Sequence, residues 1–281
     1  MVVAITGSSG FVGRKLIKAL KAERFDIVEI DTSCGIDILN TFDLPKVKPF
    51  DVLVHLAAKS YVPDSYLYPY DFYNTNVLGT LNMLELARKN AAKFIFISSY
   101  VYGSPNYLPI DEIHPLNPFN PYADSKIKGE ELCKSYHSFF GLNTIVVRPF
   151  NIYGYGQNTN FLLPSIIEQA RKGAVTLKDS RPKRDFIHID DIVDALKLCV
   201  VKKLDGLEVF NLGSGISYSV KEVVEMVNLQ YSNTLKINYT KEHRPNEVLD
   251  TVANINHAIS LLGWKPKINL EEGIKRTIHG E

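Results

Sequence analysis

A glycine-rich turn between an apolar run and an amphipathic stretch constrains this chain more than any other feature. Residues 2–6 form a continuous apolar run, which is typical of a strand buried on both faces of a parallel sheet. Glycines at positions 7, 10 and 13 follow at once. From Phe11 the apolar residues recur at helical spacing, and residues 26–30 then predict a second strand. The pattern therefore predicts a strand, a tight turn, a helix and a parallel strand.

Each glycine of the turn has a physical task. Gly7 permits the tight turn, Gly10 lets the backbone approach a pyrophosphate, and Gly13 allows the helix to pack closely on the strand. The anion would lie at the helix N-terminus. The sequence therefore predicts a dinucleotide site, and the turn residues expected to contact the cofactor are Gly7, Ser9, Gly10, Phe11 and Val12.

An acidic residue, Asp31, ends the second predicted strand. It follows the third glycine by 18 residues, close to the spacing of about 20 at which a carboxylate accepts the hydroxyls of the adenosine ribose. The same charge repels a 2′-phosphate. The sequence therefore predicts NAD rather than NADP.

Further apolar runs alternate with helical patterns along the chain. Strands are expected at 51–56, 93–98 and 143–147, with helices at 70–90 and 121–140. This alternation predicts an α/β fold with a doubly wound parallel sheet of the Rossmann type, whose ligand crevice lies at the carboxyl ends of the strands.

A change in composition after Pro149, toward Asn, Tyr and Gly, marks a candidate domain boundary. The expected NAD-binding domain comprises 1–150 and about 185–213. A smaller C-terminal α/β domain, over 151–184 and 214–281, is expected to bind the substrate.

Charge and composition exclude several classes of function. The 281 residues include 32 Lys and Arg against 31 Asp and Glu, so a net charge of +1 gives no electrostatic footprint for nucleic acid. The longest uncharged stretches, 94–110 and 149–167, contain polar residues and proline, which argues against a membrane span. Because a strand is predicted from the second residue, no signal peptide is expected, and the protein is expected in the cytoplasm.

The cysteines and histidines predict neither disulfides nor a metal site. Cys34, Cys133 and Cys199 are odd in number and widely spaced, as befits buried thiols in a reducing compartment. The seven histidines show no ligand spacing with them. No metal ligand is therefore predicted.

A tyrosine and a lysine four residues apart, Tyr122 and Lys126, lie on one face of the helix expected at 121–140. A free phenol has a pKa of about 10, and a cation about 4 Å away lowers it by roughly three units at an effective dielectric near 20. Lys126 could therefore make Tyr122 a base. Ser98-Ser99, where the strand at 93–98 ends, offers a hydroxyl to bridge Tyr122 and a substrate hydroxyl. Taken alone, such a Tyr and Lys are also typical of a surface pair.

The ordered motifs resemble the extended short-chain dehydrogenase/reductase family, in its branch of UDP-glucose 4-epimerases and sugar-nucleotide dehydratases. The resemblance covers nearly the whole chain. The matching segments are Thr6-Gly7-x-x-Gly10-x-x-Gly13, His55-Leu56-Ala57-Ala58, Asn76-Val77-x-Gly79-Thr80, Ser98-x-x-Val101-Tyr102-Gly103, Tyr122-x-x-x-Lys126, Arg184-Asp185-Phe186-Ile187-His188 and Leu262-Gly263-Trp264-x-Pro266.

The resemblance implies a catalytic set of Ser98, Tyr122 and Lys126, with Lys126 also holding the nicotinamide ribose. Further cofactor contacts are implied for Asp37, Ile38, Leu56, Ala57, Ala58 and Asn76. Small residues such as Ala57 and Ala58 suit a backbone near a cofactor and equally suit close helix packing.

On the substrate side the resemblance implies contacts to the nucleotide sugar from Ser98, Tyr122, Asn151, Asn160, Phe161, Arg184 and Arg244. Where the family often has Arg-Pro-Gly-Asp this chain has Arg244-Pro245-Asn246-Glu247, which places a ribose contact at Glu247. A forked guanidinium suits bidentate binding of phosphate. The alternative for Arg184 is a local ion pair with Asp185.

The resemblance implies an NAD-dependent UDP-sugar 4-epimerase that works through a transient 4-keto sugar. A dehydratase is disfavoured, because Ser99-Tyr100 stands where dehydratases have Asp-Glu. An NAD(P)H-dependent NDP-4-keto-sugar reductase would use the same residues. A dinucleotide-sensing protein without catalysis is a third alternative, which the intact catalytic set disfavours.

A homodimer is expected through the helices at 70–90 and 121–140, as the resemblance also implies. Aromatic enrichment is typical of an interface core. Alternatively, these side chains line the sugar crevice or pack on the sheet. The aromatic residues concerned are Tyr66, Tyr68, Tyr70, Phe72, Tyr73, Tyr136, Phe139 and Phe140.

Overall fold

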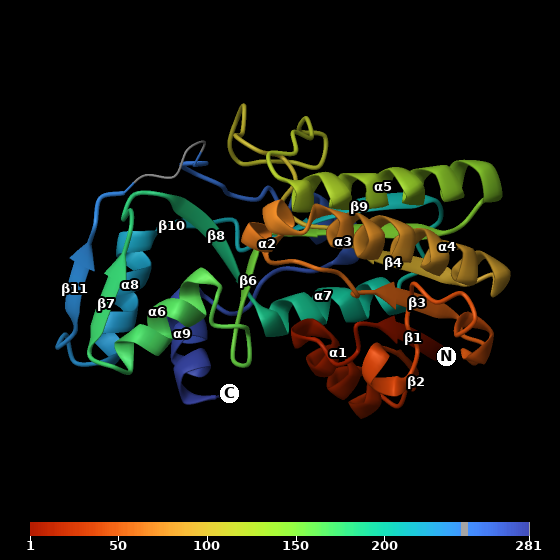
Figure 1. Cartoon of the computed structure of the whole chain (residues 1–281), viewed down its shortest axis with the longest axis horizontal. Helices are drawn as coiled ribbons and strands as arrows, with labels where there is room; N and C mark the ends of the chain where they lie inside the picture. The colour runs from red at the N-terminus through yellow and green to blue at the C-terminus, as the bar shows by residue number, and fades with distance from the viewer. Residues whose placement is uncertain (243–246, 281) are drawn as a thin grey trace. The chain divides into compact units, whose positions relative to one another are not determined.

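The computed structural model describes residues 1–242 and 247–280, and the chain forms two compact units (Figure 1). The first unit comprises Met1–Gly103, Pro115–Pro149 and Val193–Phe210. The second unit comprises Ser104–His114, Phe150–Ile192 and Asn211–Glu281.

The first unit is built on a six-stranded sheet, and the predicted doubly wound α/β fold is confirmed. The pairings that link β2, β1, β3, β4 and β5 are parallel. Because both faces are covered, Val3, Leu53, Phe94 and Ile145 are fully buried. In hydrogen-bonded order the strands are β2 (Asp26–Ile30), β1 (Val2–Thr6), β3 (Val52–His55), β4 (Lys93–Ile97), β5 (Thr144–Pro149) and β9 (Leu207–Leu212).

Helices cover both faces of this sheet (Figure 1). On one side lie α1 (Phe11–Ala22) and α7 (Ile189–Val201), and on the other α4 (Gly79–Lys89) and α5 (Pro121–Phe140). The sequence sets the ends of α5 sharply. The Asn120 side chain accepts from the Ala123 amide, Pro121 fits the first turn, and Gly141 ends the helix with φ 65°. The helix that carries Tyr122 and Lys126 therefore starts at a fixed point.

The segment predicted as one helix over 70–90 is divided in the structure. A π-helical turn, η3 (Asn74–Leu78), separates α3 (Pro69–Tyr73) from α4, and α2 (Val62–Leu67) precedes them. The wider turn brings Asn76 into the interior, where it is 1% exposed. Two short 3₁₀ turns, η1 (Thr32–Cys34) and η2 (Leu44–Lys46), occupy the crossover after β2.

The second unit contains two small sheets with their own core. One sheet has the order β10 (Ser217–Ser219), β8 (Lys183–His188), β6 (Asn151–Tyr153), and the other pairs β11 (Lys236–Tyr239) with β7 (Ala174–Leu177). Residues such as Tyr153, Ile166, Val223 and Ile274 form the core. The helical elements are α6 (Leu162–Ala170), α8 (Val220–Gln230), the π-helical turn η4 (Ala258–Leu262) and α9 (Leu270–His279).

The second unit also contains Ser104–His114, a segment inside the range expected for the NAD-binding domain. Ile110 forms a parallel bridge with Ala253, and the Asn211 side chain donates to the Ile110 carbonyl over 3.0 Å. The domain ranges given above stay a prediction, and these contacts explain why this loop packs with the C-terminal residues.

Candidate active site

The glycine-rich turn has the geometry of a phosphate cradle. Gly7 adopts φ 64°, and a Cβ there would lie 2.9 Å from the Ala57 amide nitrogen. A Cβ on Gly13 would lie 2.3 Å from the Gly7 carbonyl oxygen. Gly10 caps α1 in an extended conformation, with no side-chain cap among the described residues. The first amides of α1 are therefore available to an anion.

A cavity of about 260 Å³ adjoins this turn within the first unit. Its apolar residues suit an adenine ring, and Asp31 brings a carboxylate to the same hollow. The residues present thus fit the adenosine end of a dinucleotide. The cavity is lined by Gly7, Ile30, Asp31, Thr32, Ile36, Asp37, Ile38, Leu39, Ala57 and Thr75.

Two serines hold the carboxylate of Asp31 in place. One oxygen accepts from the amide and hydroxyl of Ser9 over 3.1 and 2.8 Å. The other accepts from the amide and hydroxyl of Ser33 over 2.9 and 2.7 Å. Burial alone would raise the pKa of Asp31, but these hydrogen bonds outweigh it and lower the pKa. The side chain therefore lines the cavity as a charged acceptor.

The other predicted cofactor residues lie on the same unit. Phe11 and Val12 begin α1 and are half-buried. The Leu56 and Ala57 amides both donate to the Thr6 hydroxyl over 3.0 Å, which fixes the backbone beside the turn, and Ala58 follows. Asn76 is bound to the same loop, because the Lys59 amide donates to its side-chain oxygen over 2.8 Å.

Tyr122 and Lys126 lie one turn apart on α5, as predicted. The Lys126 ammonium donates to the Ile97 carbonyl over 2.7 Å and lies 4.8 Å from the centre of the Phe96 ring. Burial lowers the pKa of Lys126 to about 8, although the nearby Glu130 carboxylate opposes this. Its charge is therefore held inside the unit, within reach of the end of β4.

The electrostatics of Tyr122 differ from the expectation. Burial raises the pKa of Tyr122, and a hydrogen bond with the Ser99 side chain opposes this rise. The Lys126 ammonium is bound to the Ile97 carbonyl in the structure. Phe72 packs edge-on against the Tyr122 ring at 6.3 Å between ring centres.

The structure separates the two neighbouring serines. Ser98, 2% exposed, donates its hydroxyl to the buried carboxylate of Glu130. Ser99 instead hydrogen-bonds to Tyr122. Successive side chains at the end of a strand face opposite sides, so only one of the two can meet the phenol. In the structure Ser99, and not Ser98, is therefore the serine that contacts Tyr122.

A buried ion pair beneath this site escaped the sequence analysis. Arg148 on β5 donates to Glu130 from Nε over 3.0 Å and from Nη2 over 2.6 Å. Its Nη1 donates to the Tyr102 hydroxyl over 2.9 Å. The sequence did contain a signal for this pair, because Glu130 lies four positions after Lys126 and so on the same, buried helix face. A buried carboxylate needs a charged or hydrogen-bonding partner.

The predicted substrate residues that the structure describes lie in the second unit, apart from Ser98 and Tyr122. Arg184 on β8 forms an ion pair with Glu247 and donates to the Val248 carbonyl. The alternative of an Arg184–Asp185 pair is not observed, since the Asp185 carboxylate accepts from Ser214, Gly215 and Ala253.

The other described substrate positions are Asn151, Asn160 and Phe161. The Asn151 side chain donates to the Asp185 carbonyl over 3.0 Å. The Asn160 amide donates to the Asn158 side chain over 2.9 Å, and Phe161 is the N-cap of α6. Arg244 lies outside the described residues.

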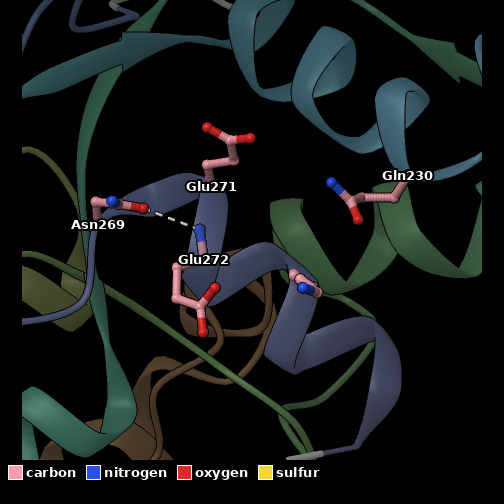
Figure 2. A pocket seen from close by; sticks show the side chains of 5 residues that line it. Gln230, Asn269, Glu271 and Glu272 are labelled. Carbon is pink, nitrogen blue, oxygen red and sulfur yellow. Dashed lines mark hydrogen bonds between the residues drawn. The ribbon is translucent and has the colours of Figure 1, made fainter.

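A second hollow, of about 280 Å³, lies in the second unit between the end of α8 and the start of α9 (Figure 2). It is lined by Gln230, Asn269, Glu271, Glu272 and Lys275. The Glu272 amide donates to the Asn269 side chain over 2.9 Å, which caps α9. Acidic residues in the first turn stabilise a helix, so this polar hollow is explained by capping.

In the described part of the chain, no helix is long and apolar enough to cross a membrane. Over residues 1–242 and 247–280, no three His, Cys, Asp or Glu side chains gather as ligands for a metal ion.

Known proteins resemble this chain in sequence and in fold. The sequence profile of the NAD dependent epimerase/dehydratase family matches residues 3–213. A putative UDP-glucose 4-epimerase of Methanocaldococcus jannaschii is 32% identical, over 99% of this chain and 97% of the relative.

Two solved structures have nearly the same fold. The UDP-glucuronic acid 4-epimerase of Bacillus cereus, in complex with UDP-glucuronic acid and NAD, is 27% identical with a TM-score of 0.90, over 99% of this chain and 98% of the other. RMD from Pseudomonas aeruginosa, complexed with NADPH, is 29% identical with a TM-score of 0.91 and the same coverage. The family contains nucleotide-sugar epimerases, dehydratases and reductases. The chain belongs to the NAD dependent epimerase/dehydratase family, and NAD is the cofactor that its glycine-rich turn and Asp31 fit.

Proposed function

We propose that this protein is a UDP-sugar 4-epimerase. The observation that carries the proposal is the Tyr122 hydroxyl, hydrogen-bonded to Ser99 and one helical turn from the buried cation of Lys126. Two of its relatives are named UDP-glucose 4-epimerase and UDP-glucuronate 4-epimerase, and these names support the choice. Asp31 also supports it, because a carboxylate at this position favours NAD over NADP. NAD is the cofactor that an epimerase needs and regenerates in each catalytic cycle.

The catalytic roles follow from the contacts. Tyr122 takes the proton of the sugar 4-hydroxyl, and Ser99 aligns the phenol with that hydroxyl. Lys126 can turn from the Ile97 carbonyl toward the cofactor ribose, where its charge favours the tyrosinate. NAD, held by the glycine-rich turn and Asp31, would supply the hydride acceptor for C4 of the sugar and, once reduced, the hydride donor to the other face of the 4-keto sugar. Tyr122 then returns the proton to the 4-oxygen of the sugar. Each side chain thereby regains its initial protonation state.

The same contacts disfavour dehydration. That reaction needs an acid to expel the 6-hydroxyl, and this chain has Tyr100 beside Ser99. The Tyr100 hydroxyl donates to the Gly103 carbonyl, so it is held within its own loop. An epimerase or a 4-keto-sugar reductase therefore fits these residues better than a dehydratase.

On the substrate side we assign the diphosphate to Arg184, and to Arg244 outside the described residues. In the structure Glu247 accepts from Arg184, so a phosphate would replace this carboxylate as the partner of the guanidinium. Glu247 would then be available to accept from the nucleotide ribose. Asn151, Asn160 and Phe161 are proposed to complete this region.

We also propose a homodimer through α3, α4 and α5. Exposed aromatic side chains on the first unit support it, including Tyr70 at 78% and Phe139 at 79% exposure. Phe72, Tyr73 and Tyr136 instead pack within the unit, as the alternative expected. Light scattering at micromolar concentration tests the dimer, which Phe139→Glu should weaken.

The activity is tested by incubating the purified protein with UDP-glucose and with UDP-glucuronic acid, without added cofactor, and separating the products. An epimerase yields the C4 epimer of at least one of them. A reductase leaves both unchanged and consumes NADH or NADPH only with a 4-keto sugar present. The sensing alternative predicts neither reaction.

A further inference from the structure

A buried histidine, His55, lies at the end of β3 beneath the NAD cavity and touches none of the proposed catalytic atoms. It is 1% exposed, and its ring centre lies 5.9 Å from that of Phe94 and 6.0 Å from that of Phe96. Its Nδ1 lies 2.7 Å from the Thr6 hydroxyl, and its Nε2 lies 3.0 Å from the Thr80 hydroxyl. Both ring nitrogens are therefore engaged.

The surrounding donors determine which nitrogen carries the hydrogen. The Thr6 hydroxyl oxygen already accepts from the Leu56 and Ala57 amides, so its own hydrogen is left for Nδ1. The Thr80 hydroxyl donates to the Asn76 carbonyl over 2.6 Å, so it must accept from Nε2. Only a neutral imidazole with its hydrogen on Nε2 satisfies both partners.

The chain of hydrogen bonds joins three walls of the NAD cavity. The cavity is lined by Gly7, Ala57 and Thr75, among others. Thr6 precedes Gly7 and accepts from the Ala57 amide through its hydroxyl. Asn76 follows Thr75. A Cβ on Gly7 would lie 2.9 Å from the Ala57 nitrogen, so the glycine-rich turn and the backbone at Ala57 are in close contact. These two walls therefore have little room to move relative to each other.

The same chain continues to the catalytic helix. The Asn76 side chain donates to the Ser125 hydroxyl over 2.9 Å, and Ser125 donates to the Tyr122 carbonyl over 2.7 Å. His55 therefore connects, through fully buried partners, the glycine-rich turn and the first turn of α5. Burial and the charge of Lys126 lower the pKa of His55 to about 3, so the ring stays neutral throughout the working range.

We propose that His55 is a positioning residue, which as the neutral Nε2–H imidazole fixes the glycine-rich turn, the Ala57 loop and Asn76 around the NAD site. It acts without touching the cofactor. The inference rests on NAD binding and not on the reaction catalysed, so it can fail or hold independently of the epimerase proposal.

The first test observes the native protein directly. With ¹⁵N-labelled histidine, the full chain should show one ring with a pyridine-type Nδ1 and a pyrrole-type Nε2, unchanged from about pH 5 to pH 8. His55→Asn should remove this signal and so assign it. A signal with the hydrogen on Nδ1, or one that titrates in this range, would overturn the proposal.

The second test measures NAD affinity. His55→Leu leaves two buried threonine hydroxyls without a partner, and we expect the Kd for NAD to rise about tenfold or more. Leu142→Ala, a buried site in the turn after α5, is the control for lost stability. It should lower the melting temperature and leave the Kd within about a factor of two.

His55→Asn gives an intermediate case, because its side-chain oxygen can accept from Thr6 while Thr80 loses its donor. We expect a Kd between those of the parent and His55→Leu. If either variant binds NAD as tightly as Leu142→Ala does at equal stability, His55 only fills the core and the proposal is wrong.

Discussion

Two carboxylates of the first unit, Asp31 at the end of β2 and Glu130 on α5, are held in opposite ways. Asp31 is half-buried, and its partners are the neutral donors of Ser9 and Ser33. Glu130 is buried and paired with the guanidinium of Arg148, with Ser98 as a second partner. The hydrogen bonds of Asp31 to the two serines can therefore be replaced by hydrogen bonds to a ligand. The ion pair of Glu130 cannot be broken without leaving a buried charge unpaired.

The difference separates recognition from support. The serine hydroxyls around Asp31 stand where ribose hydroxyls can replace them, so this carboxylate can select a cofactor. Glu130 instead fixes the end of β4, from which Ser99 and the Ile97 carbonyl reach Tyr122 and Lys126. Variants at the β4 end should therefore change catalysis or stability, while variants at the β2 end should change cofactor choice.

Tyr122→Phe should produce the largest effect, a loss of about 10²–10⁴-fold in kcat with NAD affinity nearly unchanged. Tyr73→Phe is the matched control, because the Tyr73 hydroxyl donates to Asp124 on the same helix over 2.6 Å. It should keep kcat within a few-fold of the parent. Residual activity of Tyr122→Phe within about tenfold of the parent would exclude a tyrosinate base.

Glu130→Gln should destabilise the protein by about 3–5 kcal/mol, because Arg148 is left buried without a countercharge. Glu85→Gln breaks the half-exposed pair with Arg88 on α4 and should cost about 1 kcal/mol or less. Urea unfolding of the two variants measures the difference. Equal losses would mean that burial does not distinguish the two ion pairs.

The neighbouring serines should respond differently to alanine. Ser99→Ala should lower kcat about tenfold to a hundredfold, the value of a hydrogen bond to a charged group, with little change in stability. Ser98→Ala should instead lower the free energy of unfolding by about 1–3 kcal/mol, because Glu130 loses a donor. If Ser98→Ala is the variant that loses turnover, the original assignment from the sequence was right.

Lys126 should make activity and stability respond to pH in opposite directions. Its pKa is lowered to about 8, so between about pH 8 and 10 the unfolded chain binds the proton that the folded chain has lost. Stability from this group therefore rises with pH there, while kcat falls as the cation disappears. Measuring the free energy of unfolding against pH for the parent and for Lys126→Met isolates the contribution of Lys126 to stability. A parallel rise of both quantities would contradict the role given to Lys126.

Asp31→Ala should have the smallest effect. The parent should bind NAD more tightly than NADP, and the variant should narrow the ratio by about tenfold because the charge facing the 2′ position is gone. Titration of both dinucleotides measures it. Tighter NADP binding by the parent would mean that Asp31 does not meet the ribose and would favour the reductase.

The sequence was sufficient for the elements whose cause is local. The apolar run at Val2–Thr6 and the capping residues around Pro121–Phe140 predict these elements with their observed bounds. The strand at Lys183–His188 was missed, because it begins with three charged residues and only its second half is apolar. Its partners β6 and β10 come from distant parts of the chain.

The catalytic details depended on geometry that spacing does not contain. Ser98 and Ser99 look equivalent until the end of β4 is placed against Glu130 and Arg148. The Lys126 ammonium could not be assigned to the Ile97 carbonyl without that strand. The π-helical turn at Asn74–Leu78 likewise needs Ser125 and Lys59 as partners for Asn76.

The most direct test of the proposed function uses UDP-glucose and UDP-glucuronic acid that carry deuterium at C4, without added cofactor. We predict that the protein yields the C4 epimer of at least one of them, with the deuterium kept at C4. With Tyr122→Phe the product should form about 10²–10⁴-fold more slowly. No epimer from either sugar, or an epimer that has lost its deuterium to solvent, would contradict an epimerase that works through a transient 4-keto sugar.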